Sequence, residues 1–340
     1  MSMSAASDTS RSRVVVVTGA SAGVGRAITQ AFAQQGARLA LLARGRAGLA
    51  AARADAETAG ADAAVAIPTD VADAAQVEAA ARRAEDELGP IDVWVNNAMT
   101  SVFAPAWQVT PSEFRRVTDV TYLGYVHGTL AALERMRPRN RGTIVFVGSA
   151  LAYRGIPAQA AYCAAKHATQ GFRDSVRAEL VAEDSAITLT TVNLPALNTP
   201  QFSWVRTRLP QHPRPMPPIY QPEIAARAVT WAAEHGPREI NVGGPTVLTR
   251  VANKVAPGLL DRYLGANAIA DQQADQEVGD RPDNLDAPVD DEDDYGARGP
   301  FSDDAAARSL QLWALTHKPR LAVAGATLAA AAAGWVVRGR

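Results

Sequence analysis

Short apolar runs alternate with longer stretches of helical periodicity through about the first 250 residues. The runs are largely continuous, which is typical of parallel strands buried on both faces. They fall at residues 14–17, 38–42, 91–95, 143–147, 189–192 and 239–242. The helical patterns fall at residues 25–35, 46–59, 74–88, 111–136, 158–182 and 222–233. This order predicts an α/β domain whose parallel sheet is covered by helices on both faces.

The first apolar run leads directly into a glycine-rich turn. Residues 18–25 read Thr-Gly-Ala-Ser-Ala-Gly-Val-Gly, and a helical pattern follows. Glycines at such a junction let the backbone approach a pyrophosphate, which rests at the positive N-terminal end of the helix. The context predicts a dinucleotide site, although a βα turn that only packs tightly gives the same pattern. The expected binding residues here are Thr18, Gly19, Ser21, Gly23, Val24 and Gly25.

A tyrosine and a lysine in a later helical pattern are candidates for proton transfer. Tyr162 and Lys166 are four residues apart and therefore share one helix face. We expect the ammonium to favour the phenolate and to lower the phenol pKa from about 10. Ser149, at the end of the preceding strand, could hold a carbonyl or alcohol oxygen opposite Tyr162. The trio suits carbonyl reduction or alcohol oxidation with a hydride carrier, whereas the alternative is an ordinary half-buried helix face.

In their order along the chain, these motifs resemble the short-chain dehydrogenase/reductase family over about residues 13–247. Three further features support the resemblance: Asp70-Val71 after the third strand, Asn96-Asn97-Ala98 after strand 91–95, and Pro195 after strand 189–192. The family's fold is a doubly wound Rossmann-type domain, which we expect over residues 13–265 with about seven parallel strands.

The resemblance also implies roles for individual residues. An acid at Asp70, followed by Val71, is expected near the adenine, and Asn97 and Ala98 are expected beside the cofactor. Pro195 is expected over the nicotinamide. Tyr162 and Lys166 are expected to contact the nicotinamide ribose region as well as to move the proton.

The sequence departs from the family pattern at several positions. Met99 replaces the glycine after Asn-Asn-Ala, so its side chain points away or narrows the substrate cleft. Thr121 replaces a helix asparagine that anchors a proton-relay water, which makes it a weak catalytic candidate. Ala196 replaces the glycine after Pro195, and Thr199 arrives one residue early for its contact with the carboxamide.

The end of the second strand predicts which cofactor binds. Enzymes that prefer NAD usually place an acid there to hold the ribose hydroxyls. Here the strand ends in Ala43-Arg44-Gly45-Arg46, with no carboxylate. Arg44 could stack on the adenine and pair with a 2′-phosphate. We therefore expect NADP(H), although Arg44 could also be a solvated loop charge.

Composition excludes several other classes of function. The net charge is −1, so a nucleic-acid partner lacks the basic surface that it needs. The single cysteine, Cys163, excludes a disulfide framework within the chain and a cage of several cysteines for a metal. The five histidines show no metal-ligand spacing, so no metal is expected.

Residues 200–222 have no regular pattern and are rich in proline, which predicts a substrate lid. Phe202, Trp204 and Tyr220 give it apolar surface, and several arginines give it positive charge. With Met99, these aromatic residues are the expected substrate contacts. These side chains predict an apolar or amphipathic substrate. The alternative is that the segment contacts only protein.

The two ends of the chain differ in character from the domain. Residues 1–12 are polar and predict a flexible tail without an export signal. Residues 266–304 are acidic and predict a disordered linker. Residues 305–340 predict a helical tail, in which residues 321–337 carry no charge. That stretch could anchor the protein in a membrane or dock on the domain. The domain itself is expected in the cytoplasm.

The sequence as a whole predicts an NADP(H)-dependent oxidoreductase that interconverts a carbonyl and an alcohol on a small molecule. One alternative is a dinucleotide-binding sensor or scaffold with little turnover, suggested by Met99 and Thr121. Another is an epimerase or dehydratase built on the same fold. The family resemblance also suggests a homodimer or homotetramer, and a monomer by light scattering at micromolar concentration would contradict it.

Overall fold

The computed structural model describes residues 12–317, and a seven-stranded parallel sheet forms its centre. The strand order is β11-β7-β6-β4-β1-β2-β3. The bounds are β1 Val14–Thr18, β2 Arg38–Ala43, β3 Ala63–Pro68, β4 Val93–Asn96, β6 Thr143–Ser149, β7 Thr188–Leu194 and β11 Glu239–Asn241. The chain adds β2 and β3 on one side of β1 and then adds β4, β6, β7 and β11 on the other side. The sheet is therefore doubly wound. The predicted fold class is confirmed.

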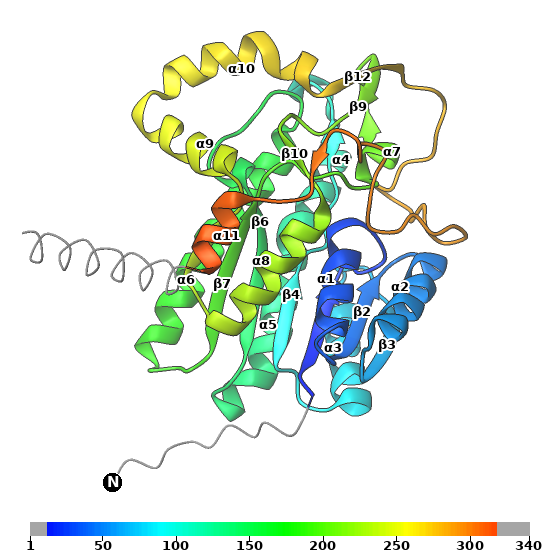
Figure 1. Ribbon diagram of the computed structural model, residues 1–340, viewed down its shortest axis with the longest axis vertical. Helices are drawn as coiled ribbons and strands as arrows, with labels where there is room; N and C mark the ends of the chain where they lie inside the picture. The colour runs from blue at the N-terminus through cyan, green and yellow to red at the C-terminus, as the bar shows by residue number, and fades with distance from the viewer. Residues whose placement is uncertain (1–11, 318–340) are drawn as a thin grey trace, which may run out of the picture.

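Helices cover both faces of this sheet (Figure 1). One apolar core packs α1 (Gly23–Ala33), α2 (Arg46–Ala59) and α8 (Pro222–His235) against one face. The other core packs α3 (Ala74–Leu88), α5 (Gly124–Met136) and α6 (Ala160–Ala182) against the opposite face. All five residues of β1 are buried, as expected for a central parallel strand.

The predicted helix over residues 111–136 is interrupted. Helix α4 (Pro111–Thr118) is followed by a π-helical turn over Asp119–Leu123, and α5 follows that turn. Such turns inside helices occur frequently at functional sites. Short 3₁₀ turns lie at Ala106–Gln108, Arg137–Arg139 and Ala150–Ala152.

The segment expected to be a structureless lid carries regular structure. It contains α7 (Gln201–Trp204), β8 (Arg206–Thr207), β9 (Gln211–Pro213) and β10 (Ile219–Tyr220). Each short strand pairs with a distant segment: β8 with β5 (Val102–Phe103), β9 with β12 (Gln273–Glu277) and β10 with β13 (Ala305–Ala306). These partners lie between 60 and 104 residues away, so local sequence pattern does not reveal them.

The chain after the sheet also differs from expectation. It forms α9 (Gly244–Val255) and α10 (Pro257–Asp271), which the sequence did not predict, whereas α11 (Leu310–Thr316) lies within the predicted helical tail. Residues 278–304, expected within a disordered linker, lie against the domain instead. Their acids find arginine partners there: Arg26 with Asp294 at 3.1 Å and Arg206 with Asp283 at 2.8 Å. Leu285 is fully buried as well. These contacts with the domain offset the conformational entropy that the segment loses when it becomes ordered, which is the reason its composition predicts disorder.

The expectations for residues 1–11 and 321–337 lie outside the described residues. Within residues 12–317, no helix combines the length and the apolar character that crossing a membrane requires.

Candidate active site

A cavity of about 640 Å³ opens at the carboxyl ends of the central strands. Its walls come from the glycine turn, the ends of β2, β4, β6 and β7, the start of α6, the lid and the C-terminal helices. Most of the residues expected from sequence line it: Gly19, Ser21, Gly23, Val24, Arg44, Asp70, Val71, Asn97, Ala98, Met99, Ser149, Tyr162, Lys166, Pro195, Thr199, Phe202 and Trp204. Thr18, Gly25, Thr121 and Tyr220 are not among the lining residues.

Thr18 and Gly25 shape the glycine turn from behind. The Thr18 hydroxyl accepts hydrogen bonds from the backbone N–H groups of Asn97 (2.9 Å) and Ala98 (3.1 Å), which joins β1 to β4. The Asn97 side chain in turn donates to the Thr18 carbonyl oxygen at 2.9 Å. A Cβ on Gly25 would lie 1.9 Å from the Gly19 carbonyl oxygen. Glycine is therefore required where α1 begins against this turn.

The residues along the cavity fit a nicotinamide dinucleotide. One continuous space leads from Arg44 and Asp70, past the glycine turn, to Ser149 and Tyr162. The turn leaves a cradle that larger residues would fill, and the N-terminus of α1 favours negative charge beside it. Such a cofactor would supply the hydride at the Tyr162 end.

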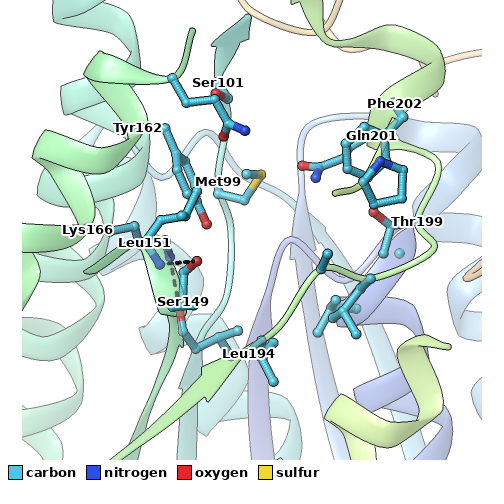
Figure 2. A pocket seen from close by; sticks show the side chains of 18 of the residues that line it. Met99, Ser101, Ser149, Leu151, Tyr162, Lys166, Leu194, Thr199, Gln201 and Phe202 are labelled. Carbon is cyan, nitrogen blue, oxygen red and sulfur yellow. Dashed lines mark hydrogen bonds between the residues drawn. The ribbon is translucent and has the colours of Figure 1, made fainter. Parts of the chain in front are cut away.

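Tyr162 and Ser149 point toward each other at one end of the cavity (Figure 2). Tyr162 comes from the first turn of α6 and Ser149 from the end of β6. Burial raises the pKa of the Tyr162 phenol well above its usual value, and a hydrogen bond with Ser149 opposes the rise. The phenol is therefore protonated near neutral pH and can donate a proton to a substrate oxygen.

Burial, rather than Lys166, dominates the pKa of Tyr162 in this structure. The Lys166 ammonium nitrogen lies 5.7 Å from the centre of the Tyr162 ring. It donates instead to the Tyr125 hydroxyl at 2.8 Å and to the Val147 carbonyl oxygen at 2.9 Å. Burial also dominates the pKa of Lys166, which it lowers to about 7.

Tyr125 is a site residue that sequence reasoning missed. Its ring is 1% exposed, and its hydroxyl also donates to the Val147 carbonyl oxygen at 2.9 Å. Tyr125 thus holds Lys166 beside the end of β6. The available signal was its position four residues after Thr121 on the same helix face.

Thr121 itself does not reach Lys166. Its hydroxyl lies in the π-helical turn, donates to the Thr100 carbonyl oxygen at 2.8 Å and accepts from the Thr100 N–H at 3.0 Å. The hydroxyl is thus bonded to Thr100 both as donor and as acceptor, which holds the loop after β4 in place. Tyr125, and not Thr121, is the hydrogen-bond partner of Lys166 in this structure.

We predict that Lys166→Met changes how stability depends on pH. The Lys166 pKa is 10.5 in the unfolded reference and about 7 in the folded protein. Between these values the unfolded chain binds more protons, so the free energy of unfolding rises with pH. Urea titrations from pH 7 to pH 9.5 are expected to show this rise in the unsubstituted protein and less of it in Lys166→Met. Equal slopes would contradict the buried, partly neutral lysine.

Met99, at the position of the expected glycine, lines the cavity between Tyr162 and Gln201 (Figure 2). Its thioether therefore narrows the cleft, which is one of the two outcomes that the sequence allowed. Pro195 and Thr199 also line the cavity, and Figure 2 shows Thr199 on the wall opposite Tyr162. Tyr220, an expected substrate contact, is not among the residues that line the cavity. It forms a β-bridge with Leu197, and its ring lies within 3.4 Å of a Cβ placed on Gly243.

Helices α9 and α10 add an apolar wall that sequence reasoning missed. Among the apolar lining residues from these helices are Leu248, Ala252, Leu260, Tyr263 and Leu264. Their spacing of four residues, 248 to 252 and 260 to 264, was a signal for such helix faces. Polar groups at this end come from Arg154, Gln159, Arg214 and Gln272. The substrate end thus combines an apolar wall with a few hydrogen-bond donors.

Comparison with known proteins identifies the family. The short chain dehydrogenase family model matches residues 13–209. The uncharacterized oxidoreductase YxnA of Bacillus subtilis (strain 168) is 32% identical over 270 residues, 78% of this chain and 75% of that protein. The 3-dehydrosphinganine reductase of Danio rerio is 31% identical over 229 residues, 65% of this chain and 68% of that protein. The 3-ketodihydrosphingosine reductase of Bos taurus is 29% identical over 236 residues, 67% and 70% of the two chains.

The chain therefore belongs to the short-chain dehydrogenase/reductase family. This confirms the resemblance drawn from its motifs. Family membership implies an oxidoreductase that acts on CH–OH groups with a nicotinamide dinucleotide as cofactor.

Proposed function

We propose that this protein is an NADP(H)-dependent oxidoreductase that interconverts a carbonyl and an alcohol on an apolar or amphipathic small molecule. The observation that carries the proposal is the pair of hydroxyls of Ser149 and Tyr162, which face each other at one end of the cavity. The other end, at Arg44 and Asp70, fits the adenosine part of the cofactor. The alternatives of a sensor and an epimerase or dehydratase predict no net transfer of hydride from the cofactor to a product.

In the proposed mechanism the side chains position the substrate and move one proton. Ser149 donates a hydrogen bond to the substrate oxygen and orients it toward Tyr162. In reduction, the Tyr162 phenol gives its proton to that oxygen as negative charge develops there. Lys166, held by Tyr125 and the Val147 carbonyl, places positive charge beside the forming tyrosinate. In oxidation, the tyrosinate takes the proton back.

The substrate is proposed to be a long-chain ketone or alcohol with a polar end. Two relatives bear the names of reductases of 3-dehydrosphinganine and 3-ketodihydrosphingosine. The apolar faces of α9 and α10 suit a hydrocarbon chain, and Arg154 and Gln159 suit a polar end. Measuring kcat/KM for a long-chain and a short-chain ketone tests this proposal. The long-chain ketone is expected to give the higher value, and equal values would contradict the proposal.

Arg44→Ala is expected to weaken NADPH binding about tenfold to a hundredfold, because charge-assisted hydrogen bonds to a phosphate contribute about 1.5–3 kcal/mol. NADH binding is expected to change less than about threefold, since NADH lacks the 2′-phosphate. Titration followed by cofactor fluorescence measures both. Equal effects on the two cofactors would contradict the proposed role of Arg44.

Two features of the sequence remain predictions. Assembly as a homodimer or homotetramer is proposed from the family resemblance. Cytoplasmic location with tethering through residues 321–337 depends on a segment outside the described residues.

A further inference from the structure

An acidic segment crosses the cofactor end of the cavity. We define the acidic strap as residues 280–302, which join β12 to β13. Arg281 in the strap donates to the carbonyl oxygens of Phe202 and Val205, both at 2.8 Å. Further along, the Gly23 N–H donates to the Gly296 carbonyl oxygen at 2.9 Å. The strap is thus attached to the lid and to the start of α1. It is the orange loop above α1 and α2 in Figure 1.

The strap meets the residue proposed to bind the 2′-phosphate. The Arg44 guanidinium donates to three strap carbonyl oxygens: those of Asn284, of Asp286 at 3.1 Å and of Leu285 at 3.4 Å. Burial lowers the pKa of Arg44, and the nearby charge of Asp290 opposes this effect. The strap therefore fixes the direction in which Arg44 points.

Asp290 occupies a slot at the start of α2. A Cβ on Gly45 would lie 2.0 Å from one of its carboxylate oxygens, and a Cβ on Gly48 would lie 2.5 Å from the other. Ser21, from the glycine turn, borders the same slot. The two glycines thus make room for the carboxylate between the nucleotide turn and the end of β2.

The Asp290 carboxylate is held in this slot at the wall of the cavity. Asp290 is 8% exposed and lines the cavity. Its charge acts on the Arg44 guanidinium. A ligand hydroxyl in this part of the cavity could donate a hydrogen bond to it.

The other anion-binding groups around the slot already have partners. The Arg46 N–H at the start of α2 donates to the Asp291 carboxylate at 3.1 Å, and the Gly48 N–H donates to the Asp290 carbonyl oxygen at 3.0 Å. Arg116 pairs with Asp70 at 2.6 Å. A phosphate placed here would meet the Asp290 charge, whereas a ribose hydroxyl would find an acceptor.

We propose that Asp290 is a second determinant of cofactor choice, supplied by the acidic strap from outside the nucleotide-binding motif. It favours the 2′-hydroxyl of NAD(H) and opposes the attraction of Arg44 for the 2′-phosphate of NADP(H). It takes the place of the acid that β2 lacks at its end. The inference rests on the proposed function, because it requires a nicotinamide dinucleotide in this cavity.

The test compares NADPH and NADH affinities of the full-length protein with those of Asp290→Asn, by fluorescence titration at constant ionic strength. Removing one negative charge close to a phosphate is expected to raise the ratio of NADPH to NADH affinity roughly tenfold or more. Asp293→Asn is the matched control, since this exposed strap residue loses the same charge. Its ratio is expected to stay within about twofold of the unsubstituted value.

Asp290→Ser provides a second measurement, in case the asparagine variant does not fold, and is expected to shift the ratio in the same direction. Circular dichroism establishes folding of each variant. An unchanged ratio in the folded variants, with both cofactors still bound, would overturn the role of Asp290 and leave the proposed function intact. Failure of the unsubstituted protein to bind either cofactor would remove the proposed function itself.

Discussion

Tyr162→Phe is expected to lower kcat for carbonyl reduction about a thousandfold, because a positioned general acid contributes roughly 10²–10⁴ in rate. The phenyl ring keeps the shape of the buried side chain and removes only the hydroxyl that faces Ser149. Cofactor affinity is therefore expected to change less than about threefold. Steady-state NADPH oxidation and fluorescence titration measure the two effects.

Tyr153→Phe is the matched control for this substitution. Tyr153 also lies near the end of β6, and its hydroxyl accepts a hydrogen bond from Asn193 at 3.2 Å. It is absent from the cavity lining, so its loss is expected to leave kcat within about threefold. Full activity in Tyr162→Phe would show that another group supplies the proton.

Gly25→Ala is expected to abolish cofactor binding at concentrations where the unsubstituted protein is saturated. The added methyl would lie 1.9 Å from the Gly19 carbonyl oxygen and 2.7 Å from the Asn97 side-chain nitrogen. Gly19 belongs to the turn that would cradle the pyrophosphate, and the Asn97 side chain donates to the Thr18 and Gly19 carbonyl oxygens of this turn. The turn must therefore open to admit the added methyl. Overpacking of this kind costs about 1–3 kcal/mol of stability. Thermal unfolding and cofactor titration measure the two effects.

Gly171→Ala separates the steric effect from the general effect of replacing glycine. Gly171 lies within α6, and a Cβ there would have no neighbour within 4 Å. Alanine has the higher helix propensity, by about 1 kcal/mol, so this variant is expected to be at least as stable as the original and to bind cofactor normally. Normal cofactor binding in Gly25→Ala would contradict the fit of the turn to a dinucleotide.

The predictable parts of the molecule were those encoded locally. Val14–Thr18 is a continuous apolar strand, and the glycines that follow it read as one motif within eight residues. Tyr162 and Lys166 are joined by helix geometry alone. The parallel sheet and the position of Ser149 at the end of a strand followed from the alternation of strands and helices. These local features predicted most of the residues that line the cavity.

The features that were missed depend on contacts between distant residues. The acidic strap appears disordered by composition, and only the arginines of the folded domain, such as Arg26 and Arg206, give its acids partners. Thr121 lies in a π-helical turn and bonds to Thr100, whereas Tyr125, to which the sequence assigned no role, bonds to Lys166. The pKa shifts of Tyr162 and Lys166 follow burial, which the motif does not reveal.

The central claim is hydride transfer to a carbonyl in the Ser149–Tyr162 cavity. The most direct measurement supplies NADPH deuterated at the transferred position together with a long-chain 3-ketone, and determines the mass of the product. The proposed function predicts an alcohol that carries one deuterium on the former carbonyl carbon, formed in step with loss of NADPH absorbance and nearly absent with Tyr162→Phe. Unlabelled product without cofactor consumption, or no product across a broad panel of ketones despite tight cofactor binding, would contradict it.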